Sequence, residues 1–357
     1  MNKNQTIAYL RQLCCSGLNK EIVVAEFLRT VQMAIPSCNN SFSGCDEHII
    51  PSYHILDFVT TNLEESQLVA SYLTPKRRQC FVNWFKQHSV LADVAVFDES
   101  YFKSDFYNLV SRQYDHHHIL WALIKQNGKT LGMLSLYRPR LQKAFTSNDQ
   151  ALLSGLLPYV AHALHAPDNI DVEYNANGAS GIILLDQQGV IVHLSDEAQR
   201  LLILACHPAI TIHAGKNRVA LLAKLTALCQ RLTAVFQGHH VSPPTWCHIA
   251  ANGRFVFRAQ WLAPVNSGQQ RLIGMTIEHQ EPILLHLLRQ IKALPLSPTQ
   301  REVCLMLAQN VSQEDIAQRL HIKLSTAKDH IRKIYLKLDI HRREELLSLL
   351  SPAVITR

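Results

Sequence analysis

Four apolar residues near the C-terminus recur at spacings of four, three and four: Ala327, Ile331, Ile334 and Leu338. This period places them on one face of a helix from about residue 324 to 338, and that face must pack against other elements. The opposite face carries Ser325, Asp329, Arg332 and Lys333, flanked by Lys328 and Lys337. From Lys323 to Arg343, seven basic residues stand against two acidic ones, an imbalance typical of a surface that faces phosphates.

Two helix starts precede this basic helix. Ser297-Pro298-Thr299-Gln300 combines a capping serine, a proline at the first helical position and a glutamine that can complete a capping box. We expect that helix to end near Asn310, which tolerates a left-handed backbone. Ser312 then caps a short second helix with Glu314 and Asp315 at its positive end. Short capped helices followed by a basic helix predict a helix-turn-helix that fits the major groove of DNA.

The last part of the chain closely resembles the LuxR-type helix-turn-helix domain over about 55 residues. The matching residues are Leu296-Ser297-Pro298, Arg301-Glu302-Val303, Leu307-Ala308, Glu314-Asp315-Ile316-Ala317, Leu320, Ile322, Thr326, Lys328, His330, Ile334, Lys337-Leu338, Arg343 and Glu345. Four positions depart from the family pattern. Asn310 and Asp339 stand where glycine is usual, Lys323 where serine often caps the recognition helix, and Ala327 where valine is usual.

The resemblance implies specific roles in binding double-stranded DNA. The residues expected at base edges are Lys328, Asp329 and Arg332, and those expected at phosphates are Lys323, Ser325, Thr326, Lys333 and Lys337. It also implies a homodimer formed through the last helix, with Leu346, Leu347 and Leu350 at the interface. A second apolar stripe, from Ile283 to Leu294, is a rival dimer surface. RNA polymerase is a further candidate partner.

The roughly 295 residues before this domain contain two α+β patterns. In the first, strand-like runs at 119–125 and 129–137 flank Asn127-Gly128, the dipeptide that best forms a tight hairpin. Ser147 and Gln150 then predict a capping box for a long helix that closes near His165. In the second pattern, after a linker at 166–169, runs at 181–186 and 190–194 flank a turn, Ser195 caps a helix, and strands follow at 254–261 and 271–278.

The first pattern weakly resembles the end of a GAF domain, and the second the opening of a PAS domain. We therefore expect a multidomain chain with two α+β sensor-type domains followed by an all-α four-helix LuxR-type helix-turn-helix domain. The expected boundaries are 1–166 for the GAF-like domain, 171–280 for the PAS-like domain, 281–295 for a connecting helix and 296–357 for the DNA-binding domain.

Composition excludes several other classes of protein. With 47% hydrophobic and 18% charged residues, most of the 357-residue chain should fold. Neither a long uninterrupted apolar stretch nor a signal-peptide pattern occurs, so we expect a cytoplasmic protein without a membrane partner. The nine cysteines are scattered and form no Cys-x-x-Cys pair, which argues against disulfide or zinc modules. No catalytic triad, phosphate loop or carboxylate pair is recognisable, so the chain is not expected to be an enzyme, and no cofactor is identified.

Two groups in the first pattern allow alternative interpretations. Consecutive His116, His117 and His118 could suggest a metal site, but neighbours on a strand point to opposite faces, so a solvated strand entry is the better prediction. The aromatic residues could line a pocket for a small molecule, with core packing as the default for each: Trp84, Phe85, Phe97, Tyr101, Phe102, Phe106, Tyr107 and Trp121. Asp186 is interpreted as a turn residue.

These patterns together predict a sequence-specific, DNA-binding transcriptional regulator. Its N-terminal domains would sense a small molecule or a partner and control DNA binding or dimerisation. The alternative is a protein-interaction adaptor that uses the helix-turn-helix fold without reading DNA. The sequence leaves the effector and the operator open.

Overall fold

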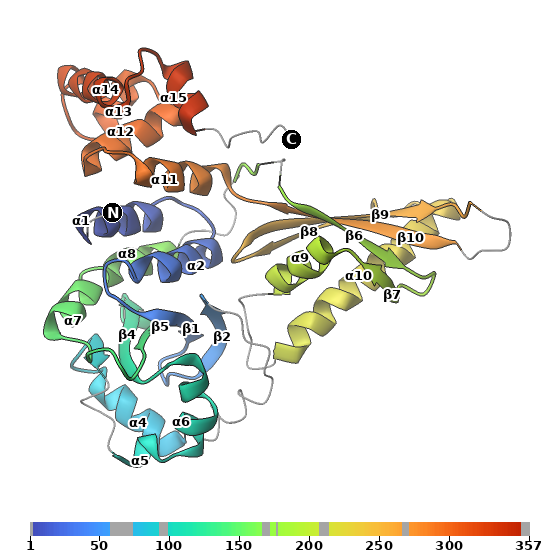
Figure 1. The fold of residues 1–357 in the computed structure, drawn as a ribbon, viewed down its shortest axis with the longest axis horizontal. Coiled ribbons are helices and arrows are strands. Elements are labelled where there is room, and N and C mark those ends of the chain that lie inside the picture. The colour runs from blue at the N-terminus through green and yellow to red at the C-terminus, as the bar shows by residue number, and fades with distance from the viewer. Residues whose placement is uncertain are drawn as a thin grey trace.

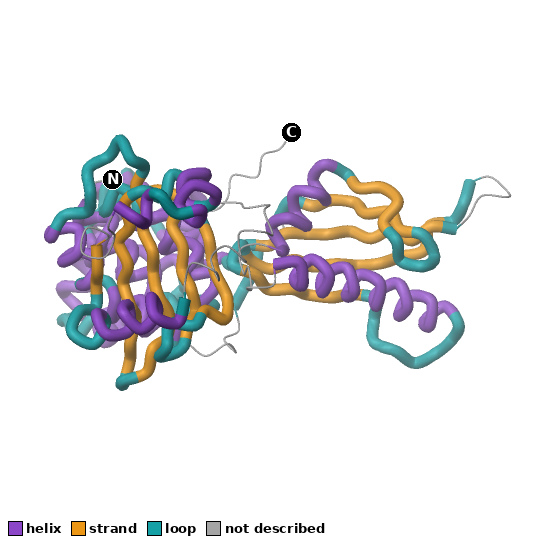
Figure 2. The backbone as a smooth tube through the Cα atoms, turned by 90° about the horizontal axis from the view of Figure 1, so that it is seen from below, coloured by secondary structure: helices purple, strands orange, loops and turns teal. Residues whose placement is uncertain are grey.

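The computed structural model describes residues 3–57, 74–92, 99–165, 172–175, 178–206, 214–265 and 271–350. Two five-stranded antiparallel sheets, each with its own helices, precede a C-terminal group of helices (Figure 1). The strands form two separate groups (Figure 2). Phe97, the linker at 166–169 and the turn at 266–268 lie outside the described residues.

The first sheet has the strand order β2-β1-β5-β4-β3. Its strands are β1 (Cys38–Cys45), β2 (Pro51–Leu56), β3 (Val90–Ala92), β4 (His118–Gln126) and β5 (Lys129–Arg138). Alternate residues of a strand point to opposite faces. In β4, Leu120, Ala122 and Ile124 belong to one apolar core, and Ile119, Trp121 and Leu123 belong to another. The sheet is therefore buried on both faces.

Helices pack on both faces of this sheet. Helices α1 (Lys3–Cys14), α2 (Lys20–Val31) and α8 (Leu157–Leu164) share the larger core, where Phe27 and Phe42 are buried. The other side of the domain contains α4 (Pro75–Trp84), α5 (Glu99–Phe102), α6 (Asp105–Leu109) and a 3-10 turn, Ser111–Tyr114 (Figure 1).

The predicted hairpin between β4 and β5 is confirmed. Gln126 pairs with Lys129, so Asn127 and Gly128 form the two-residue turn. Their φ angles are 51° and 78°, in the left-handed region that asparagine and glycine tolerate best.

The helix predicted to close near His165 is divided into α7 (Ser147–Ser154) and α8. Pro158 lies in the first turn of α8 and has no N–H with which to continue a helical ladder from α7. The predicted cap is one residue too late, because Thr146 is the N-cap and Asp149, not Gln150, completes the capping box. The carboxylate of Asp149 also pairs with Arg138 at 3.2 Å, which favours this register.

The second sheet has the strand order β7-β6-β10-β9-β8. Its strands are β6 (Ser180–Leu185), β7 (Ile191–Leu194), β8 (Thr245–Ala250), β9 (Gly253–Leu262) and β10 (Leu272–Gln280). As predicted, Asp186 forms the turn before β7, accepting hydrogen bonds from the backbone N–H groups of Gln188 and Val190 at 2.9 and 2.8 Å. Strand β8 had no counterpart among the strands expected from sequence.

Helices α9 (Asp196–Cys206) and α10 (Ala214–Phe236) pack on one face of the second sheet. The hydroxyl of Ser195 caps α9 by accepting the N–H of Ala198 at 3.1 Å, as predicted. The sequence analysis missed α10, which contains a stretch, Val219–Phe236, long and apolar enough by composition to cross a membrane. One side of this stretch packs in the domain core through Leu221, Leu225, Leu228, Cys229 and Leu232, so core packing accounts for the 28% of the stretch that is buried. Its other side exposes Val219, Leu222, Val235 and Phe236.

Helix α11 (Ile283–Ala293) lies between the first domain and the C-terminal helices (Figure 1). Leu285 and Leu288 belong to the core of the first domain, whereas Ile291 belongs to the core of the C-terminal helices. The predicted stripe on this helix is therefore largely buried within its own chain. Because both ends of α11 are anchored in this way, the helix joins two hydrophobic cores.

Candidate DNA-binding surface

The C-terminal domain is built from α12 (Pro298–Ala308), α13 (Gln313–Arg319), α14 (Leu324–Leu338) and α15 (Arg343–Leu350). The bounds of α14 agree with the sequence prediction. Ala327, Ile331 and Ile334 are buried against Val303, Cys304 and Leu307 of α12 and Ile316 of α13, and Leu338 packs beside them. The periodic apolar face therefore orients α14 and turns its other face outward.

Local caps and turns position these helices. The hydroxyl of Ser297 accepts the N–H of Gln300 at 3.3 Å, and the N–H of Ser297 donates to Oε1 of Gln300 at 3.0 Å, so the predicted capping box is confirmed. Ser312 caps α13 by accepting the N–H of Asp315 at 3.0 Å. Asn310 has a φ of 64°, as expected where a helix ends in a left-handed residue.

The start of α14 is less well capped. Lys323 occupies the N-cap position, and its side chain makes no capping hydrogen bond to the first turn of the helix. The first N–H groups of a helix have no partner within the helix and carry the positive end of its dipole. An anion is favoured at such a position. The other end of α14 stops at Asp339, whose φ of 53° is left-handed.

The outward face of α14 carries most of the predicted DNA contacts. Ser325, Thr326, Lys328, Arg332 and Lys333 are exposed. Asp329 is partly exposed, and its Oδ2 lies 2.6 Å from Nζ of Lys333. The hydrogen bond from Lys333 lowers the pKa of Asp329. In the described part of the chain, Lys328 and Arg332 make no side-chain hydrogen bond or ion pair, so these two cations are available at the centre of the face.

Lys337 differs from the other predicted phosphate contacts. Its Nζ lies 2.8 Å from Oε1 of Gln300 and 3.4 Å from the carbonyl oxygen of Pro295. The side chain therefore joins the end of α14 to the start of α12. Lys323, at the opposite end of α14, is exposed.

The leucines predicted at a dimer interface differ in their exposure to solvent. Leu346 and Leu350 are only 0% and 1% exposed and belong to the core of their own domain, so they are not surface residues of this chain. Leu347 is partly exposed, and its neighbour Leu349 is 49% exposed. The two apolar stripes thus leave less exposed apolar surface for a second copy of the chain than the sequence suggested. Dimerisation stays a prediction.

A charged group that was not predicted from sequence lies where the first domain, the end of the second domain and α11 meet. Glu26, Arg29, Glu281 and Arg289 approach one another there, although they come from distant segments. Arg289 interrupts the apolar stripe of α11, and this interruption was the one signal in the sequence that could have identified it. Arg301 of α12 is a buried cation whose Nε and Nη1 have no hydrogen-bond partner.

The three consecutive histidines do not converge. His116 stacks on Tyr137, with ring centroids 3.5 Å apart, and burial lowers its pKa to about 3. The prediction of a solvated strand entry is therefore wrong for His116, because its buried ring packs on the partly buried Tyr137. His117 instead contacts the hydroxyl of Tyr107 at 2.6 Å. Among the described residues no group of three possible metal ligands occurs, and the nine cysteines are free thiols.

Core packing describes most of the predicted aromatic cluster. Phe85, Tyr101, Tyr107 and Trp121 are buried, and Phe102 and Phe106 pack against Tyr101. Trp84, at the end of α4, is exposed at its edge. Core packing, the default prediction for each ring, therefore describes these residues.

Comparison with solved structures finds several distant similarities. The chain is similar to the VqsR LBD domain from Pseudomonas aeruginosa at 17% identity, covering 45% of this chain and 96% of that chain, with a TM-score of 0.33. It is similar to the Vibrio cholerae VqmA dimer at 15% identity, covering 49% and 82%, with a TM-score of 0.19. The E. coli DhaR(N)-DhaL complex gives 11% identity, 76% and 86% coverage, and a TM-score of 0.23.

The C-terminal helices give the clearest comparison. A comparison with curated protein sequences finds no match. Residues 294–350, however, match the model of the family described as bacterial regulatory proteins, luxR family. This match spans the capped helices and the exposed basic face described above, and a regulatory family agrees with the prediction that the chain is not an enzyme. The C-terminal domain of this chain is therefore a DNA-binding domain of the LuxR family of bacterial regulatory proteins.

Proposed function

We propose that the chain is a sequence-specific transcriptional regulator that places α14 in the major groove of duplex DNA. The observation that carries this proposal is the division of α14 into a buried apolar face and an exposed face bearing Lys328, Arg332 and Lys333. A helix of this kind, preceded by a second short helix, can present side chains to base edges while its neighbours hold the backbone.

Within this proposal, Lys328, Asp329 and Arg332 read base edges. Asp329 must exchange its ion pair with Lys333 for a base donor such as the amino group of cytosine. Lys333 is then released toward a phosphate. Lys323, Ser325 and Thr326 lie at the uncapped start of α14, where backbone N–H groups add to phosphate binding.

A salt titration tests DNA binding directly. Fluorescence anisotropy of the full chain with duplexes selected from a random library should give affinity that falls steeply as salt rises from about 50 to 200 mM, because phosphate contacts release counterions. A preference for the selected sequence over a scrambled duplex should persist across the range. Absence of both effects would favour an adaptor that does not read DNA.

We further propose that the two N-terminal domains, interpreted as GAF-like and PAS-like sensors of a small molecule or partner, act on DNA binding through α11. The shared burial of Leu285, Leu288 and Ile291 supports this role, because the helix cannot move without disturbing one of two cores. A flexible Gly-Ser insertion between Ala293 and Pro295 should change operator affinity. Unchanged affinity would make α11 a passive connection.

The remaining proposals concern the oligomeric state, the partners and the cellular location of the protein. We place the protein in the cytoplasm as a homodimer, with RNA polymerase as a further partner. Leu347 and Leu349, which flank the buried face of α15 on opposite sides, are the exposed or partly exposed leucines that support an interface there, since Leu346 and Leu350 fill the core. Light scattering of the protein, free and with a two-half-site duplex, tests the dimer.

A further inference from the structure

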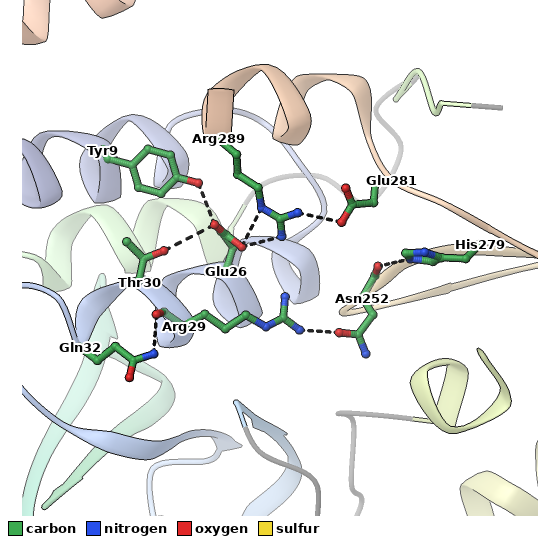
Figure 3. Close-up of polar contacts among 9 residues, drawn as sticks. All are labelled: Tyr9, Glu26, Arg29, Thr30, Gln32, Asn252, His279, Glu281 and Arg289. Carbon is green, nitrogen blue, oxygen red and sulfur yellow. Dashed lines mark hydrogen bonds and ion pairs between the residues drawn. The ribbon is translucent and has the colours of Figure 1, made fainter. Parts of the chain in front are cut away.

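Glu26 of α2 lies where the first domain meets α11 (Figure 3). Its side chain is only 7% exposed. Oε2 accepts two hydrogen bonds from the guanidinium of Arg289, at 2.7 and 3.2 Å, and Oε1 accepts the hydroxyl of Tyr9 at 2.9 Å. Burial raises the pKa of Glu26, but the hydrogen bonds and charge of Arg289 outweigh it, so the pKa is lowered overall. Glu26 is therefore a buried, ionised acceptor.

Arg289 has a second acidic partner. Its Nη1 lies 2.8 Å from Oε1 of Glu281, which follows β10 of the second domain. One guanidinium thus joins the first domain, the end of the second domain and α11 (Figure 3). The second partner is more exposed than the first, with 36% of the Glu281 side chain accessible. The Glu26 contact is therefore the better protected of the two.

Further polar contacts surround this pair. Arg29 of α2 donates a hydrogen bond to Oδ1 of Asn252 in the turn between β8 and β9. The backbone oxygen of Asn252 is 2.7 Å from Nε2 of His279 in β10. Lys292 of α11 lies over the ring of Tyr9, 4.4 Å from its centroid. We call Glu26, Arg29, Glu281, Arg289 and Lys292 the junction cluster.

The junction cluster can hold α11 in only one orientation. Arg289 directs Nε and Nη2 toward one oxygen of Glu26 and Nη1 toward Glu281, so the planar guanidinium must be correct in both position and rotation. Loss of Arg289 would leave the buried carboxylate of Glu26 without its cation, which is strongly unfavourable, whereas loss of the Glu26 charge leaves Arg289 with Glu281 as its partner. The apolar contacts of Leu285 and Leu288 are less directional, so they permit small rotations that the ion pair does not.

Resting on the proposed function, we propose that the Glu26–Arg289 pair fixes the orientation of the DNA-binding domain and that its separation is the regulated step. The first domain contacts the C-terminal helices through α1, α11 and α12, and the outward face of α14 remains exposed. The docked arrangement therefore leaves the face of α14 accessible to DNA. In a dimer, two recognition helices must reach half-sites about one helical turn apart, so a fixed orientation preorganises binding.

Hydrogen exchange of the full chain tests the structural part of this proposal without DNA. Glu26→Gln keeps the shape of the side chain and removes its charge. Exchange in α11 should become about tenfold faster, whereas the core amides of α12 to α14 should be unchanged. Glu281→Gln, the same substitution at the more exposed partner, should have a smaller effect. Glu99→Gln, which removes the exposed pair between α5 and Lys103 on the side of the first domain away from α11 (Figure 1), should have none there.

Two results would overturn the structural part. One is unchanged exchange of α11 in a folded Glu26→Gln variant. The other is an equal effect from Glu99→Gln. If Glu26→Gln does not fold, Arg289→Lys provides the same test, because its single ammonium cannot reproduce the three donors that Arg289 directs at Glu26 and Glu281 and should also accelerate exchange.

DNA affinity tests the regulatory part separately. Glu26→Gln should weaken binding to a two-half-site operator by about 5- to 20-fold, within the range typical of coupling between sites. Binding to random duplex should stay nearly constant, since the face of α14 is untouched. Faster exchange without weaker operator binding, or with tighter binding, would overturn regulation by this pair. Failure of the wild-type protein to bind any DNA would instead refute the proposed function and leave the exchange result valid.

Discussion

The ammonium of Lys337 lies 2.8 Å from Oε1 of Gln300, so the last turn of the recognition helix is tied to the first turn of α12. The same oxygen accepts the N–H of Ser297 in the capping box. Beside it, the buried guanidinium of Arg301 donates to the carbonyl of Leu294 at 3.4 Å. The short connection after α11 is thus held from both α12 and α14. A displacement of α11 would be transmitted to the recognition helix through these contacts.

Lys337 should therefore act in positioning more than in phosphate binding. Lys337→Met should reduce the free energy of unfolding by about 0.5–1 kcal/mol, because one hydrogen bond to Gln300 is lost at a partly solvated site. The slope of log affinity against log salt should be unchanged. Lys333→Met is the matched control and should flatten that slope by about one. Equal flattening by both variants would show that Lys337 holds a phosphate after all.

Arg332 and Lys333 should be separable by their effects on specificity. Arg332→Ala should cost about 1–3 kcal/mol at the operator and relax one base preference, because its exposed guanidinium is free to reach a base edge. Lys333→Ala should weaken binding to operator and random duplex alike. Competition binding with both duplexes measures the difference. Indistinguishable losses for the two variants would contradict the assignment of bases to one residue and phosphates to the other.

Features that depend on near neighbours could be predicted from sequence. The bounds of α14, the Ser297 capping box and the Asn127-Gly128 turn all involve residues within a few positions of one another. The cap of α7 was misplaced because the choice of Asp149 depends on Arg138, which lies on β5. Local propensity cannot register a partner that only the folded chain brings near.

In the candidate site, too, contacts between near neighbours were predictable and contacts between distant segments were not. The exposed face of α14 was predictable, since a helical period divides buried from exposed residues. The pairing of Asp329 with Lys333 was not predicted, although their spacing of four permits it. The contact of Glu26 with Arg289 joins residues 263 positions apart and could not be inferred from any local pattern. The long helix α10 was not predicted, because no recognised helix start signal precedes it in the sequence.

The uncapped start of α14 predicts a gain in stability. Lys323→Ser should place a hydroxyl at the N-cap and slow hydrogen exchange in the first turns of α14 by about two- to fivefold, equivalent to about 0.5–1 kcal/mol. DNA affinity should fall, because a cation near the phosphates is lost. Lys328→Ser, the same change inside the helix, is the control and should accelerate exchange. Similar protection from both substitutions would argue against a capping effect.

Asp57 predicts a pH dependence of the first domain. It follows β2, and its Oδ1 is buried without a hydrogen-bond partner. Burial raises the pKa of Asp57 to about 7, although the hydrogen bonds with Asn40 and the charge of Arg29 act in the opposite direction. An unfolded aspartate has a pKa of about 3.9. Between about pH 4 and pH 7, the folded state therefore holds a proton that the unfolded state has released.

Because the folded state binds more protons in this window, its stability should decrease as the pH rises, by up to about 1.4 kcal/mol per pH unit from this group. The contribution should level off above about pH 7. Asp57→Asn cannot ionise, so its stability relative to the wild type should increase from pH 5 to pH 8. Denaturant unfolding at several pH values, with hydrogen exchange of β1 and β2 to localise the effect, measures this difference. Asp186→Asn, at an exposed turn, controls for the loss of a carboxylate. If the difference in the free energy of unfolding between Asp57→Asn and wild type is constant from pH 5 to pH 8, Asp57 is not protonated in the folded state.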